Sequence, residues 1–249
     1  MESSDIILKR PPFLRLPQGV RRAGLIKTWE LSGGVVARYY RNLLQQFGAS
    51  PRALDEREDE KEHLFYERLF DGAALPQAVS VLDIGSGLGY VITYLQGRGV
   101  PIYDYLGVDL LPQFIDLCRA QYAPPFTFAE ANFVSDAFQP NRKFDLVVNM
   151  GVLVSRVLLY EHYIDYSIRK MIALSNKYVL FNLITHIDDS LGNYAGRKRV
   201  GQITFLPKSK LFAILDAATR DLGVRYELHE VNIYPDATDA FVRITVNDV

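Results

Sequence analysis

The sequence predicts an α/β fold: a doubly wound, mostly parallel sheet with helices on both faces. Three observations support this fold class. From residue 79 onward, short apolar runs of strand length alternate with helical patterns. A glycine-rich turn, GSGLG, follows the first of these runs, where doubly wound sheets bind ligands. Two partly alternating runs close the chain, as an antiparallel pair of strands would.

The residues before the sheet predict an arm followed by helices. The first 19 residues contain RPPF and LPQG and predict an irregular arm, because proline removes a backbone donor and interrupts helices. Two helical stretches follow, at about 20–47 and 52–70, with a stop signal at FGASP between them. We therefore expect residues 1–75 to form an arm and helical lid, and residues 76–249 to form the core.

The core is expected to contain buried strands, intervening helices and a closing hairpin. The apolar runs that predict buried strands are VSVLDI (79–84), YDYLGVD (103–109), FTFAEA (126–131), FDLVVNM (144–150) and KYVLFNLI (177–184). The helical patterns lie at about 88–97, 112–122, 157–174 and 208–221. The closing pair is VRYELHEV (224–231) and DAFVRITV (239–246).

One long connection has no predicted structure. It runs for about 20 residues from His186 to Leu206, which is long for a compact domain, and contains the basic segment GRKR (196–199). We interpret it as either a second lid or an insertion, and an anionic substrate would favour the lid.

The composition restricts the function classes. A net charge of −1 provides no electrostatic footprint for nucleic acid. A single cysteine excludes an internal disulfide framework, and four scattered histidines form no visible metal cluster. No apolar run reaches the length of a signal peptide or of a membrane span. We expect a cytoplasmic protein that binds no metal, nucleic acid or membrane; its oligomeric state is left open.

The glycine turn has the pattern D-x-G-x-G-x-G and differs from a dinucleotide fingerprint. After Gly85 and Gly87, the position where that fingerprint needs its last glycine holds Tyr90. Glycine permits positive φ and leaves no Cβ between the backbone and a ligand. Asp83, just before the turn, would repel a pyrophosphate and suits a ligand with a cationic amine.

A second acid indicates a nucleoside. Asp109 ends the strand YLGVD, 20 positions after Gly89, where an acid binds ribose hydroxyls. Hydrogen bonds to a charged acceptor are strong and fix the sugar without a phosphate. A ribose, an amino-acid end and no phosphate requirement together describe S-adenosylmethionine.

With these motifs in this order, residues 79–247 resemble the class I S-adenosylmethionine-dependent methyltransferases. The resemblance implies a seven-stranded sheet in the order 3-2-1-4-5-7-6, with strand 7 antiparallel. It also implies that Asp109 binds the ribose and that Leu110 and Phe133 enclose the adenine. Asn132 stands where an aspartate is commoner as the polar partner of the adenine. The turn residues expected near the methionine part are Gly85, Ser86, Gly87 and Gly89.

The N-terminal helix is expected to cover the ligand, as lid segments do in this family. Arg38, Tyr39 and Tyr40 lie in VVARYYRNL. Arginine can bind the ligand carboxylate through a bidentate contact. The face of a tyrosine ring can make a cation–π contact with the sulfonium. The alternative is that the two tyrosines only pack the lid onto the sheet.

The ends of strands four and five supply further candidates. The resemblance implies that Asn149 and Met150, in NMG, face the reacting sulfonium. Asn182 and His186 lie in FNLITH, where either could point into the crevice. His186 is the histidine best placed for a general base, and a structural role is its alternative.

The leading functional interpretation is a methyltransferase of bacterial secondary metabolism that acts on a small molecule. NMGV lacks the Asn/Asp-Pro-Pro-aromatic motif of the types that methylate adenine or glutamine amides. Cys118 is misplaced for the cytosine C5 type, and Asn149 stands where the metal-dependent catechol type would want aspartate.

Two alternatives remain open at this point. Azetidine-2-carboxylate synthases resemble this layout, and there the ligand's own amine attacks its γ-carbon and methylthioadenosine leaves. A protein that only binds S-adenosylmethionine, as a sensor or accessory subunit, is the second alternative.

Overall fold

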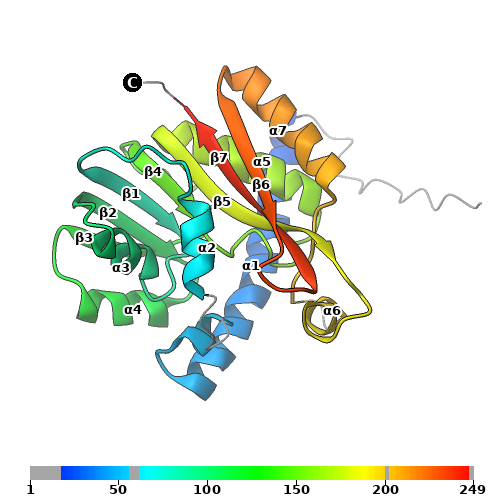
Figure 1. Ribbon diagram of the computed structural model, residues 1–249, viewed down its shortest axis with the longest axis horizontal. Helices are drawn as coiled ribbons and strands as arrows, with labels where there is room; N and C mark the ends of the chain where they lie inside the picture. Colours follow the sequence, from blue (N-terminus) through cyan, green and yellow to red (C-terminus); the bar gives the residue numbers. More distant parts are fainter. Residues whose placement is uncertain (1–17, 56–61, 200–201, 247–249) are drawn as a thin grey trace, which may run out of the picture.

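The protein is described by a computed structural model that covers residues 18–55, 62–199 and 202–246 (Figure 1). Its seven strands form one sheet in the order β3-β2-β1-β4-β5-β7-β6, and β7 runs antiparallel to both of its neighbours. The predicted sheet order is confirmed. The strands are β1 (Val79–Ile84), β2 (Ile102–Asp109), β3 (Phe126–Glu130), β4 (Phe144–Asn149), β5 (Ser175–Ile187), β6 (Arg225–Val231) and β7 (Ala237–Thr245).

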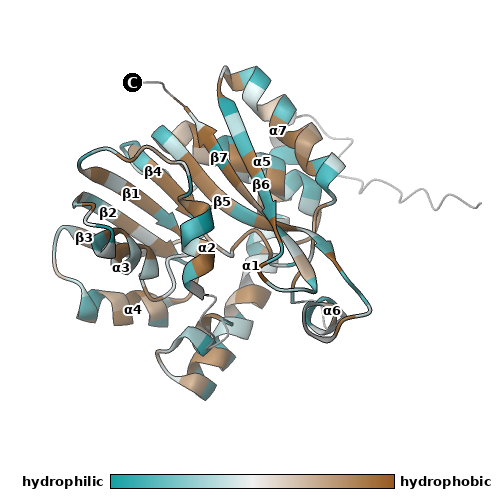
Figure 2. Cartoon of the chain, viewed as in Figure 1, coloured by the Kyte–Doolittle hydropathy of each residue, from teal (hydrophilic) through white to brown (hydrophobic). Residues whose placement is uncertain are grey.

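Helices cover both faces of the sheet, as expected. The helices are α1 (Gln18–Phe47), η2 (Pro51–Leu54, a 3-10 turn), α2 (Glu62–Leu69), α3 (Tyr90–Gly97), α4 (Pro112–Gln121), α5 (Tyr160–Leu174), α6 (Gly192–Arg199) and α7 (Lys208–Leu222). One hydrophobic core joins the sheet to α5, α7 and the first half of α1, and another joins it to α2, α3 and α4. The middle strands are mostly hydrophobic (Figure 2), because both of their faces are covered.

The N-terminal region differs from the prediction in one respect. A single helix over 52–70 was expected, but residues 51–54 form a 3-10 turn and α2 begins at Glu62. Asp55 ends that turn with φ +62°, a left-handed conformation that stops a helix. The predicted arm falls mainly on residues 1–17, which lie outside the described residues; Gln18 and Gly19 are already helical.

The long connection after β5 contains a helix that was not predicted. Its residues 192–199 form α6, and Ile203 makes an isolated bridge to Ser155. β5 itself extends over 175–187 because it pairs with β7 along most of this length. Within the described parts of the chain, no helix combines the length and hydrophobicity needed to cross a membrane.

Candidate functional site

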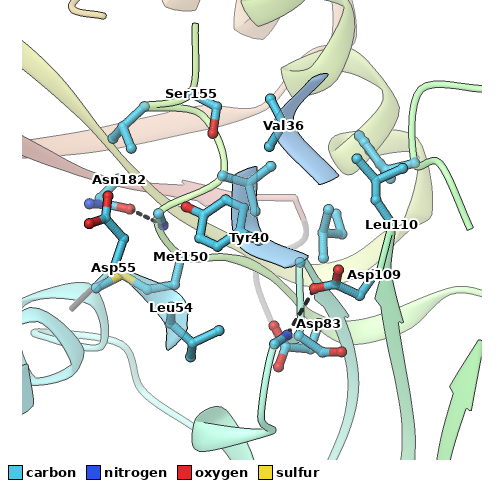
Figure 3. A pocket seen from close by; sticks show the side chains of 18 of the residues that line it. Val36, Tyr40, Leu54, Asp55, Asp83, Asp109, Leu110, Met150, Ser155 and Asn182 are labelled. Carbon is cyan, nitrogen blue, oxygen red and sulfur yellow. Dashed lines mark hydrogen bonds between the residues drawn. The ribbon is translucent and has the colours of Figure 1, made fainter. Parts of the chain in front are cut away.

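A cavity opens at the carboxyl ends of the parallel strands, beneath α1 (Figure 3). Its walls come from α1, the 51–55 segment, α2, the ends of β1, β2, β4 and β5, and α6. In Figure 3, Tyr40 enters from α1, with Met150 and Asn182 on one side of the view and Asp109 and Leu110 on the other. The cavity therefore lies where parallel α/β sheets bind ligands.

The glycine turn adopts a backbone that side chains disfavour. Gly85 and Gly87 have φ of +73° and +50°. A Cβ on Gly85 would collide with Val152, and one on Gly87 would lie 2.8 Å from Leu54. The missing side chains thus make room for other parts of the protein as well as for a ligand. Gly89, predicted to contact the ligand, does not line the cavity: it is the N-cap of α3 and packs against Tyr122.

The Asp109 carboxylate is held beside the glycine turn by two backbone hydrogen bonds. Its Oδ2 accepts a hydrogen bond from the Gly87 N–H at 3.0 Å, and its Oδ1 accepts one from the Leu111 N–H at 2.9 Å. Burial raises the pKa of Asp109, whereas these backbone N–H groups lower it. The carboxylate lines the cavity with its orientation already fixed, and each oxygen keeps a free lone pair for a hydroxyl.

Asp83 and Ser86 present polar groups beside the turn. Asp83 is buried and its Oδ2 accepts a 2.6 Å hydrogen bond from the Tyr105 hydroxyl. Burial is the main cause that raises the pKa of Asp83 to about 7; the Tyr105 hydrogen bond opposes this rise and the Asp109 charge adds to it. Ser86 lines the cavity, and its buried Oγ has no hydrogen-bond partner among the described residues. An amino-acid end of a ligand would find both an acid and a hydroxyl here.

The residues expected around an adenine gather on the opposite side of the turn. Leu110, Asn132 and Phe133 all line the cavity. The Asn132 Oδ1 accepts a hydrogen bond from the Val134 N–H at 3.2 Å, which leaves its amide nitrogen available. Gly33 of α1 lies against this group: a Cβ there would be 3.2 Å from Leu110 and 3.3 Å from Asn132.

One face of α1 lies over the cavity, and it is not the face that carries Arg38. Val36, Ala37 and Tyr40 line the cavity, at spacings that share a helix face. Arg38 is exposed and does not line the cavity, so the predicted clamp on a ligand carboxylate is not formed. Tyr39 also stays outside and packs edge-on against Tyr40, with ring centroids 5.4 Å apart.

Only some of the site residues predicted at the ends of β4 and β5 line the cavity. Met150 and Asn182 line the cavity, and the Asn182 Oδ1 accepts a 2.7 Å hydrogen bond from the Gly151 N–H. Asn149 does not line it: alternation along β4 puts Asn149 on the same face as Val147, in the core beneath α5. The Asn149 amide is fully buried there, without a hydrogen-bond partner among the described residues.

His186 is not a general base for this cavity. Its side chain is exposed and it does not line the cavity. The pairing of β5 with β7 shifts register between Ile184 and His186, so the inward alternation of Asn182 and Ile184 does not continue to His186.

The far end of the cavity holds charged residues that sequence reasoning missed. Arg197 of α6 forms an ion pair with Asp55, and Asp239 of β7 adds a buried carboxyl. Arg197 lies in the basic segment interpreted as either a second lid or an insertion, and this interpretation was the one available signal. Nothing in the local pattern marks Asp55 or Asp239, because they reach the cavity from segments far apart in the sequence.

Comparisons with known proteins agree with this geometry. Residues 81–165, which contain the glycine turn and Asp109, match a family model described as a methyltransferase domain. No match was found among curated proteins. The fold is similar to magnesium protoporphyrin IX methyltransferase (ChlM) from Synechocystis PCC 6803 with bound SAH. That match has 14% identity, a TM-score of 0.58, and covers 87% of this chain and 100% of that one.

Two further solved structures share the fold. DhpI, in a complex with SAM and HEP, is 18% identical with a TM-score of 0.55, over 88% of this chain and 97% of that one. The plantazolicin methyltransferase BamL, with a triazolic desmethylPZN analogue and SAH, is 16% identical with a TM-score of 0.56, over 86% and 99%. The chain therefore shares its sheet order and fold with solved methyltransferases, and its residues 81–165 match the methyltransferase-domain family model.

Proposed function

We propose that this protein transfers the methyl group of S-adenosylmethionine to a small-molecule acceptor in the biosynthesis of a secondary metabolite. One observation carries the proposal: a single cavity contains the glycine turn with Asp109 at one end and a separate polar and aromatic end beneath α2 and α6. The first end suits the cofactor, and the second leaves room for another molecule.

The cofactor end has a group for each part of S-adenosylmethionine. Asp109 would accept hydrogen bonds from the ribose hydroxyls, and Leu110 and Phe133 would enclose the adenine. Asp83 and Ser86 would meet the methionine end. The buried, unpaired Ser86 hydroxyl supports this placement, because a buried polar group without a partner costs free energy until a ligand pairs with it.

The reaction requires alignment more than acid–base groups. The acceptor's nucleophile attacks the methyl carbon in line with the carbon–sulfur bond, whose electron pair stays on sulfur, and S-adenosylhomocysteine remains. Holding two reactants in the correct orientation can lower the barrier by roughly 7–11 kcal/mol. Tyr40, at the centre of Figure 3, lines the cavity, and there it would separate the cofactor from bulk water and border the acceptor.

The acceptor end supports a small molecule over a macromolecule. Its lining includes the ring side chains of Tyr66 of α2, Tyr194 of α6 and Tyr40 of α1, which suit a small molecule. ChlM and BamL, which share the fold, carry names or ligands of small-molecule type. Those ligands belong to those proteins, and the chemical class for this chain is taken up below.

The test uses S-adenosylmethionine with a trideuterated methyl group. The full chain is incubated with this cofactor, first alone and then with a library of small molecules, and products are identified by mass spectrometry. We expect no turnover of the cofactor alone, and S-adenosylhomocysteine together with a trideuteromethylated product when a suitable acceptor is present. Asp109→Ala serves as the binding-deficient control.

Two outcomes would overturn the proposal. Methylthioadenosine formed from the cofactor alone, with an equal amount of a cyclic amino acid, would establish intramolecular cyclisation instead. Calorimetry that detects binding of NADH, or no binding of S-adenosylmethionine, would show that the glycine turn serves another ligand.

A further inference from the structure

Asp239 is a buried carboxyl that no interaction of the fold explains. Its side chain lies on β7 opposite Ile184 of β5, on the sheet face that lines the cavity. Asp239 is only 1% exposed, and its Oδ2 has no hydrogen-bond partner among the described residues. A carboxyl in this position costs free energy unless something in the cavity pairs with it.

Three cations of the neighbouring elements pair with other acids. Arg197 pairs with Asp55, Lys208 pairs with Glu230, and Arg243 pairs with Glu227. Burial, together with the nearby Asp236 carboxylate, raises the pKa of Asp239 to about 7. No positive partner of Asp239 is found among the described residues, and a cationic group would therefore stabilise the site.

The surroundings of Asp239 are aromatic. Phe241, two residues along β7 on the same face, packs against Phe65 with ring centroids 6.0 Å apart. Phe65 in turn packs against Tyr234 at 6.0 Å, and Tyr234 against Tyr194 at 5.8 Å. Aromatic faces attract cations and accommodate flat apolar groups. This end of the cavity therefore offers a carboxylate set in a wall of rings.

The cavity as a whole is lined by more acidic than basic residues, so its charge is negative like that of Asp239. The described lining residues include four acids, Asp55, Asp83, Asp109 and Asp239, and one base, Arg197, already paired with Asp55. S-adenosylmethionine carries two positive groups, a sulfonium and an ammonium, and one carboxylate. Its net positive charge would offset the acids at the cofactor end. Asp239 stays unmatched, and an anionic acceptor would add repulsion.

We propose that Asp239 recognises the acceptor, and that the acceptor carries a protonated amine on an aromatic or apolar body. The ammonium donates to the Asp239 carboxylate while the body packs against Phe65, Tyr194 and Tyr234. This inference rests on the proposed function only in calling the bound amine the methyl acceptor. Recognition of the amine is a binding property that is measured without any reaction.

The test compares three probes with nearly the same body and different charge. Phenethylamine, 2-phenylethanol and 3-phenylpropionate are titrated into the full chain by NMR, both with and without saturating S-adenosylhomocysteine, near neutral pH. We expect the amine to bind at least ten-fold more tightly than the alcohol and the carboxylate. Equal affinities, or tighter binding of 3-phenylpropionate, would overturn the proposal without the need for any variant.

A variant then assigns the preference to Asp239. In Asp239→Asn, which keeps the shape and removes the charge, we expect the preference for the amine to fall below about three-fold. Asp239→Ser is the second variant if the first unfolds, as judged by thermal unfolding. The matched control is Asp116→Asn, on the exposed side of α4, which should keep the full preference. If folded Asp239→Asn or Asp239→Ser keeps the preference for the amine, the proposal is wrong.

The design separates this inference from the proposed function. Binding of S-adenosylhomocysteine is measured by calorimetry in the same samples. Its absence would contradict the methyltransferase function, while the probe comparison on the ligand-free protein still decides the role of Asp239. Tight binding of S-adenosylhomocysteine without an amine preference would contradict only the inference.

Discussion

The two ends of the cavity treat their carboxyl groups in opposite ways. At the cofactor end, both oxygens of Asp109 receive backbone hydrogen bonds from residues of the same motif, Gly87 and Leu111. At the acceptor end, the Oδ2 of Asp239 and the Nε of Arg197 are buried without partners among the described residues. Asp109 is therefore oriented before a ligand arrives, whereas the Oδ2 of Asp239 depends on a ligand for pairing.

This difference shows how the two specificities are built. A binding site common to a whole family can use backbone groups, which local sequence positions reliably. The proposed acceptor site uses side chains from α2, α6 and β7, which only the packing of the chain brings together. The predictions below are therefore directed at one end or the other.

The largest effect is expected from Gly85→Ala, at the cofactor end. The Cβ would collide with Val152 in a backbone of φ +73°, where a side chain costs about 1–2 kcal/mol before any clash. We expect the free energy of unfolding to fall by about 2–4 kcal/mol and affinity for S-adenosylhomocysteine to fall at least 100-fold, by denaturant unfolding and calorimetry. Gly97→Ala, where a Cβ meets open space, is the control.

A double substitution isolates the clash. Adding Val152→Ala removes the methyl group that the new Cβ meets, so part of the stability should return while the conformational cost remains. If Gly85→Ala is as stable as the parent, the turn is not as rigid as the comparison requires.

The next effect concerns Asp109→Ala. Hydrogen bonds to a charged group contribute about 1.5–3 kcal/mol, so affinity for S-adenosylhomocysteine should fall by that amount. The variant also frees the N–H groups of Gly87 and Leu111. Calorimetry gives the affinity, and Asp116→Ala on α4 serves as the surface control. A folded variant that binds as tightly as the parent would remove Asp109 from the site.

The pH dependence of stability distinguishes the two ends again. Burial raises the pKa of both Asp83 and Asp239 from an ordinary 3.8 to about 7, but Asp83 has the Tyr105 hydroxyl as a partner. A raised pKa means that the folded protein holds the proton more tightly than the unfolded chain. The stability linked to each carboxyl is therefore complete below about pH 4 and is lost as the pH rises through about 7.

For the ligand-free protein, this amounts to about 1–3 kcal/mol for each carboxyl between about pH 5 and pH 8. Denaturant unfolding across this range should show a decline, and Asp239→Asn should make it shallower. The corresponding surface variant, Asp116→Asn, should leave the slope unchanged. An identical slope in the parent and Asp239→Asn would show that Asp239 is already ionised at low pH and hence paired.

The smallest effects are expected from Arg38→Ala and His186→Ala. Both side chains are exposed and neither lines the cavity. Affinity for S-adenosylhomocysteine and turnover should stay within about 0.5 kcal/mol of the parent, as for surface substitutions generally. Tyr40→Ala provides the contrast, because Tyr40 enters the cavity from the same helix as Arg38. A large loss in Arg38→Ala would mean that α1 turns another face to the ligand when it binds.

The fold and the cofactor end could be predicted from the sequence because their signals are local. Buried parallel strands appear as continuous apolar runs, and the turn at Gly85 and Gly87 requires glycine at fixed spacing. Asp109 follows from its distance along the chain. The α2 boundary was misplaced because the left-handed Asp55 interrupts a pattern that reads as one helix.

The acceptor end was decided by the tertiary structure. Whether Arg38 or Tyr40 faces the ligand depends on how α1 is rotated over the sheet, and whether His186 points inward depends on a register shift between β5 and β7. Asp55, Arg197 and Asp239 come from three distant segments, so no spacing in the sequence links them. The sequence alone determined the strands and the cofactor turn, since backbone preferences act between near neighbours, and the sheet order was implied by the family resemblance. The acceptor site arises from side chains that meet only when helices and strands pack, and only the folded chain determines it.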